Sequence, residues 1–124
     1  MANRIIKINR GDSYEVAINV LEKASIDKKY LLTANDVVYF AILYPHQHFE
    51  DAIVLKGYTL EDQDVQTGEI LVKITPNDTR QLEPGVYYYT AKLQRGGNIL
   101  TVGDFDEPEE VRTLIERTKF IINE

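Results

Sequence analysis

The chain has 124 residues, no cysteine, and a net charge of −6 from 14 Lys/Arg and 20 Asp/Glu. This length suits one domain over residues 1–124 with one core, and the lack of cysteine excludes disulfides and thiolate metal sites. The acidic balance disfavours nucleic acid as a partner. We also expect no signal peptide and no membrane contact, because no stretch approaches the roughly 20 apolar residues of a membrane helix.

Apolar and polar residues alternate along most of the chain, and this period of two predicts strands. The first strands are expected around Ile6 to Ile8 and from Tyr14 to Val20. Within the polar segment from Glu22 to Asn35, residues Ala24 to Leu32 are expected to form a loop or a helical turn. Residues 37–43 are apolar on both faces, which is typical of a central strand or of one whose second face meets another subunit.

Further strands are expected at 52–59, 70–74, 85–93 and 99–102, with a Gly96-Gly97 hairpin turn before the last of these. A short helical turn is expected near 77–82, with Thr75 or Asn77 as its N-cap. Residues 111–117 fit either a strand or a helix. About seven or eight short strands predict an all-β antiparallel sandwich.

Two histidines, His46 and His48, are the sharpest candidates for chemistry. On extended backbone, side chains at i and i+2 point the same way, and with Glu50 or Asp51 they would hold zinc in a small metal-dependent enzyme. The competing interpretation is a solvated loop after Pro45, which we favour. We therefore expect no metal and no other cofactor.

Other catalytic patterns are missing from the sequence. The acidic run from Asp104 to Glu110 lacks the spacing of a calcium loop, and no nucleophile stands beside an evident base. We therefore expect that the protein is not an enzyme. The eight tyrosines suit either protein interfaces or carbohydrate stacking, so a carbohydrate-binding module is an alternative.

The run from Asp78 to Tyr89 resembles the E–F corner of immunoglobulin-like sandwiches. In that corner a helical turn precedes a glycine and then a tyrosine, whose hydroxyl bonds to backbone upstream. By this resemblance Asp78, Leu82, Gly85 and Tyr87 are the corner residues, with Tyr87 as the anchor. The resemblance implies an immunoglobulin-like topology.

An ordered series of short motifs is similar to small β-sandwich virion proteins of tailed phages and prophages of Gram-positive bacteria, especially the N-terminal domain of baseplate upper proteins. The motifs are Gly11-Asp12, Asp36-Val37-Val38-Tyr39-Phe40, Tyr44-Pro45, Ile53 to Lys56, Ile70 to Pro76, Asp78 to Leu82, Pro84 to Tyr89 and Val111 to Ile122. The family pattern makes the last stretch a strand pair or one long bent strand, so we favour strand over helix at 111–117.

The resemblance implies a non-enzymatic structural protein of the virion, in the tail, baseplate or fibre attachment, made in the bacterial cytoplasm. Because the chain ends at Glu124, where relatives often continue into a fibre, an adaptor or scaffold role is favoured over host recognition. Its partners would be other virion proteins and further copies of itself. The candidate interface residues are Val37, Tyr39, Ala41, Leu43 and Tyr88.

Overall fold

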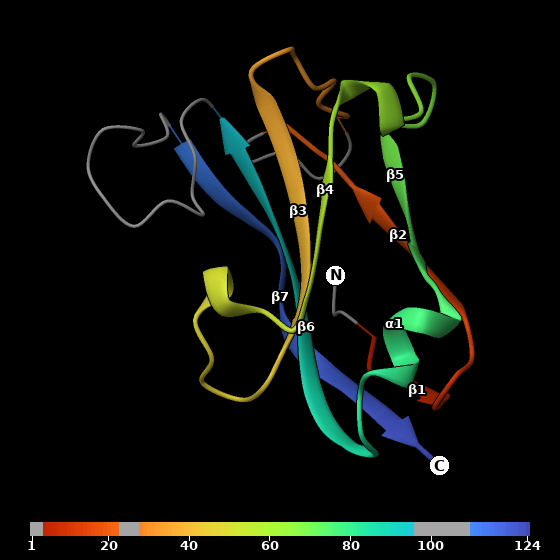
Figure 1. Cartoon of the computed structure of the whole chain (residues 1–124). Coiled ribbons are helices and arrows are strands. Elements are labelled where there is room, and N and C mark those ends of the chain that lie inside the picture. The colour runs from red at the N-terminus through yellow and green to blue at the C-terminus, as the bar shows by residue number, and fades with distance from the viewer. Residues whose placement is uncertain (1–3, 23–27, 96–109) are drawn as a thin grey trace.

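The computed structural model describes residues 4–22, 28–95 and 110–124 (Figure 1). Strands dominate these residues, so the expected all-β class is confirmed. The strands are β1 (Ile6–Asn9), β2 (Tyr14–Asn19), β3 (Asp36–Leu43), β4 (Val54–Tyr58), β5 (Glu69–Ile74), β6 (Gly85–Arg95) and β7 (Glu110–Asn123). The short helices are η1 (Phe49–Asp51), η2 (Leu60–Asp62) and α1 (Pro76–Arg80).

The strands form two sheets that face each other (Figure 1). The larger sheet has the order β1-β7-β6-β3-β4, and the smaller sheet pairs β2 with β5. All pairs are antiparallel except β1 with β7, which run parallel from Ile6 opposite Phe120 to Asn9 opposite Asn123. The first and last strands of the chain are therefore neighbours.

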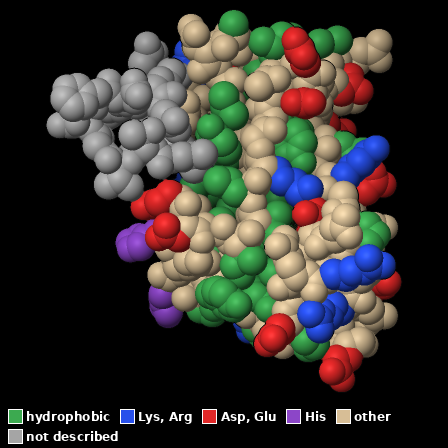
Figure 2. Space-filling view, in the orientation of Figure 1, with side chains coloured by type: hydrophobic (Ala, Val, Ile, Leu, Met, Phe, Trp, Pro, Cys, Tyr) green, Lys and Arg blue, Asp and Glu red, His purple; other side chains and the backbone are tan. Residues whose placement is uncertain are grey.

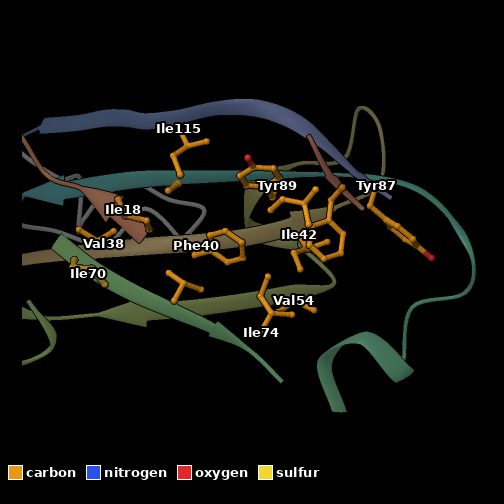
Figure 3. Packing of buried hydrophobic residues seen from close by; sticks show 14 of the residues in the cluster. Ile18, Val38, Phe40, Ile42, Val54, Ile70, Ile74, Tyr87, Tyr89 and Ile115 are labelled. Atoms are coloured by element: carbon orange, nitrogen blue, oxygen red, sulfur yellow. The ribbon is translucent and has the colours of Figure 1, made fainter. Parts of the chain in front are cut away.

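The main core fills the space between the sheets (Figure 3). Alternation along β2 and β5 turns Ile18 and Ile70 inward, where they are almost completely buried. From the larger sheet, Phe40 and Phe120 meet them with no exposed surface. Each such side chain contributes roughly 1.5–3 kcal/mol through burial, so this one-sided pattern holds the sheets together.

The ambiguous segment at 111–117 is a strand, and the helical alternative is wrong. It belongs to β7, which pairs with β6 over most of its length. The register shifts between Tyr89 and Lys92, so the pairing continues past an irregularity. Pairing along β6 satisfies the backbone groups of β7 and overrides the helical spacing of Val111, Leu114 and Ile115.

Several expected elements need adjustment. Of the segment expected as a loop or a helical turn, residues 28–32 are not helical, and residues 24–27 lie outside the described residues. Lys29 forms an isolated antiparallel bridge with Leu21. The expected helical turn occurs one to two residues early, as α1, with Thr75 as its N-cap. The Gly96-Gly97 turn, the strand at 99–102 and residues 104–109 of the acidic run lie outside the described residues.

Hydrogen bonds at the N-terminus of α1 determine where this helix begins. The Thr75 hydroxyl accepts a hydrogen bond from the backbone N–H of Asp78, and the Asp78 carboxylate accepts one from the N–H of Thr75. This capping box, with Pro76 in the first helical position, fixes where the turn begins. None of the helices in the described residues has the length and apolar character to cross a membrane.

Candidate interaction surface

The predicted corner residues meet at one end of the fold. The Tyr87 hydroxyl donates a 2.6 Å hydrogen bond to the carbonyl of Glu83, and Leu82 is buried beneath the turn. Gly85 has φ 156°, which side-chain-bearing residues rarely adopt. Burial raises the pKa of Tyr87, with the neighbouring Tyr44 adding to the effect. These contacts tie the turn to the start of β6.

Asp78 adds a second link at this end. Lys56 on β4 lies 2.8 Å from the Asp78 carboxylate, so the ion pair ties the edge of the larger sheet to α1. Burial alone would raise the pKa of Asp78, but hydrogen bonds from Lys56 and Thr75 outweigh it and lower the pKa below its ordinary value. The ionised carboxylate thus links β4 to α1.

A second apolar cluster lies on the outer face of the larger sheet, the face turned away from β2 and β5. Its buried members are Ala41 and Leu43 on β3 and Phe49 on η1. The partly buried residues around them are Tyr39, Ala52, Leu55 and Tyr88. β3 therefore packs apolar side chains on both faces, as its sequence predicted.

Phe49 reaches this face because a tight turn reverses the chain after β3. The N–H of Gln47 donates to the carbonyl of Tyr44, with Pro45 and His46 between them, and His46 has φ 64°. The Gln47 side chain accepts from Tyr44 N and donates to the carbonyl of Asp51. These bonds hold the segment as a compact loop against the sheet.

The Phe49 ring makes two specific contacts on the outer face. It meets Tyr39 edge-on at 6.4 Å between centroids, and the Lys92 ammonium lies 5.1 Å from its centre. Both geometries are favourable for aromatic rings. The Tyr39 ring in turn lies over Gly57 on β4, where an added Cβ would come within 3.3 Å of it.

The structure separates the five candidate interface residues into two groups. Ala41 and Leu43 have no exposed surface, so they are inaccessible to a partner in this conformation. Val37, Tyr39 and Tyr88 are partly exposed. The sequence analysis missed Phe49. The feature that could have indicated its burial is that it is a lone aromatic residue inside a polar loop.

The histidine arrangement expected for zinc is not present. The backbone at His46 is left-handed rather than extended, so the assumption behind a shared metal ion is wrong. Both histidines project from the surface (Figure 2). In residues 4–22, 28–95 and 110–124, no three His, Asp or Glu side chains come close enough to hold a metal ion.

A shallow pocket of about 250 Å³ opens on the outer face beside the turn. It is lined by Pro45, His46, Tyr88 and Arg117. Arg117 donates from Nη2 to the carbonyl of Gln47 at 2.7 Å. A larger cleft of about 510 Å³ opens on the smaller sheet and contains one Glu and one Lys, Glu15 and Lys73, on neighbouring strands.

A polar cluster caps the opposite end of the core. Buried Asp36 accepts a 2.6 Å hydrogen bond from the Tyr30 hydroxyl and two more from Thr33, and Arg95 lies 3.5 Å away. Burial alone would raise the pKa of Asp36, yet the hydrogen bonds and Arg95 lower it. The guanidinium groups of Arg95 and Arg112 lie near the Tyr30 ring, 5.7 and 6.0 Å from its centre.

Gln63 joins three segments of this end of the molecule. Its amide nitrogen donates to the carbonyls of Tyr30 and Gly68 at 2.8 and 2.9 Å, and its oxygen accepts from Leu32 N at 2.8 Å. The side chain is buried, and it makes all three of these hydrogen bonds inside the protein. The sequence analysis assigned no role to Gln63.

The tyrosines form no exposed aromatic strip. All eight lie in the described residues, and only Tyr44 is largely exposed, at 53%. Its ring packs against buried Tyr87 at 5.3 Å between centroids.

No family model matches the chain, and no curated protein or solved structure is significantly similar to it.

Proposed function

We propose that the protein is a non-enzymatic structural component of a phage virion, in the tail, baseplate or fibre attachment, and acts through protein–protein assembly. The observation that carries this proposal is the outer-face cluster. Tyr39, Leu55 and Tyr88 keep partly exposed apolar surface around it, and apolar residues rimmed by polar ones are typical of assembly surfaces. The order of motifs along the sequence supports the virion assignment.

We further infer that the sandwich is of the immunoglobulin type. With β2 to β7 taken as strands B, C, C′, E, F and G, one sheet reads G-F-C-C′ and the other B-E. The bond from Tyr87, near the start of β6, to Glu83 supports the same assignment. An experimental strand order that separated β3 from β6 would contradict it.

The carbohydrate-binding alternative has less support. Sugar stacking needs exposed aromatic faces, and the tyrosines are mostly buried or half-buried in the fold. A glycan array would separate the two functions, because a structural component should give no specific glycan signal. Binding of a defined glycan, lost on Tyr44→Ala, would favour the alternative.

Proteomics of purified phage particles from a bacterium that carries the gene tests the assembly role. We expect the chain to be a stoichiometric particle component. Tyr88→Glu, which places a charge on the outer face, should reduce incorporation about tenfold if that face carries the contact. The matched control is Leu71→Glu, an exposed strand residue on the other sheet. Circular dichroism of both variants verifies folding.

Absence of the chain from particles, together with a strictly monomeric state by light scattering, would overturn the proposal. Equal incorporation of both variants would remove the outer face as the contact surface.

A further inference from the structure

The pocket beside the turn has a fixed wall on each side. Pro45 and His46 form the centre of the tight turn, and Gln47 bridges its two ends through Tyr44 N and Asp51 O. On the sheet side, Tyr88 stands on β6 opposite Lys119 of β7. The pocket is therefore built from a braced loop and a paired strand, and it needs little ordering to accept a ligand.

Arg117 is held ready inside this pocket. Its Nη2 donates to the carbonyl of Gln47, which belongs to the braced loop. A guanidinium has five N–H donors in one plane, so this bond orients the group and uses one donor. A guanidinium oriented in this way suits a carboxylate, which accepts two parallel hydrogen bonds from it.

Among the described residues that line the pocket, Arg117 carries a full positive charge. Lys92 lies opposite Tyr39 and Lys119 lies opposite Tyr88, so both lysines share the outer face with these tyrosines. Arg117 lies on the same face, where it lines the pocket. The acidic residues nearest along the chain, Glu50, Asp51 and Glu116, are exposed and do not line the pocket. A single oriented guanidinium in this pocket favours an anionic ligand there.

We propose that this pocket receives a carboxylate from an acidic segment of a partner protein, with Arg117 as the anion contact and Tyr88 and Pro45 packing against the segment. The inference rests on the proposed function, for which it specifies the chemistry of the partner. An acidic segment fits because the pocket joins one oriented cation to aromatic and proline walls, a combination that binds a carboxylate and the chain next to it.

Titration of the full chain with a capped hexaglutamate peptide tests the proposal, with amide NMR shifts as the readout. We expect the largest shifts at His46, Tyr88 and Arg117. Arg117→Gln should weaken binding about tenfold, as expected for the loss of a charge-assisted contact. Arg117→Lys should recover only part of it, because an ammonium lacks the paired donors.

Lys73→Gln is the matched control. It removes one exposed charge from the other sheet, so we expect an unchanged dissociation constant. Equal weakening by Lys73→Gln and Arg117→Gln would overturn the proposal in favour of diffuse charge attraction. Shifts located elsewhere, or tighter binding of a heparin oligosaccharide at the same residues, would also overturn it.

The two proposals fail in different ways. If the chain is present in particles but hexaglutamate does not bind, the carboxylate pocket is wrong and the assembly role stands. If the peptide binds through Arg117 but the chain is absent from particles, the pocket stands and the virion role is wrong.

Discussion

The hydroxyl of Tyr87 lies 2.6 Å from the carbonyl oxygen of Glu83, to which it donates a hydrogen bond. The four-residue separation means that the side chain at the start of β6 bonds to the turn that leads into its own strand. The turn after α1 is thereby tied to the sheet, and buried Leu82 fills the space beneath it.

Tyr87→Phe should lower the free energy of unfolding by about 1 kcal/mol, because it removes this bond while keeping the ring. Chemical denaturation measures the change. Tyr88→Phe makes the same chemical change one residue later on the outer face, and we expect it to be near neutral. An equal loss in both variants would show that the corner bond has no special role.

Asp36→Asn should destabilise the protein by about 2 kcal/mol at pH 7, because the ionised carboxylate accepts bonds from Tyr30 and Thr33. The folded-state pKa lies below the ordinary 3.8, so this stabilisation is present above pH 3.8. It is lost as the pH falls through the lower folded pKa.

Denaturation curves from pH 7 to pH 2 test this dependence. The difference between wild type and Asp36→Asn should shrink at the acid end, whereas exposed Asp51→Asn should change the stability at pH 7 by less than about 0.5 kcal/mol. A difference that stays constant with pH would contradict the assigned ionisation.

Gln63→Ala should cost about 3 kcal/mol, because it leaves the carbonyls of Tyr30 and Gly68 and the N–H of Leu32 without their side-chain partner. Gln66→Ala, in the same turn but exposed, should change stability by less than about 0.5 kcal/mol. Urea unfolding of the two variants measures the contrast. A loss below about 1 kcal/mol for Gln63→Ala would mean that water replaces the amide.

His46→Gly should raise stability by about 0.5 to 1 kcal/mol. The left-handed backbone at φ 64° costs a residue with a side chain about 1–2 kcal/mol, and the greater freedom of glycine in the unfolded chain offsets part of this gain. Thermal unfolding measures the outcome. A lower melting temperature would show that imidazole contacts outweigh the backbone strain.

The alternation of apolar and polar residues predicted much of the fold, because this pattern depends only on residues within a single strand. The alternation in Tyr14 to Val20 gave a strand, and the doubly apolar run at 37–43 gave a central strand that packs on both faces. The two candidate conformations at 111–117 were separated only by the resemblance, since the spacing there fits both.

The contacts that periodicity missed join residues far apart in the chain. Gln63 bonds to Tyr30 and Leu32, and Lys56 pairs with Asp78. The partners in each contact are more than 20 residues apart in the chain, so the pattern within one strand does not predict them. Phe49 was missed for a different reason. A polar loop usually faces water, and its burial depends on the turn that folds it back over β3.

The parallel pairing of β1 with β7 determines how the domain resists a pulling force. Tension applied before Ile6 and after Asn123 acts along the two strands in opposite directions, because Ile6 lies opposite Phe120 and Asn9 opposite Asn123. The hydrogen bonds between the strands are then loaded together in shear instead of opening one after another. Extension from the two ends should therefore meet high mechanical resistance.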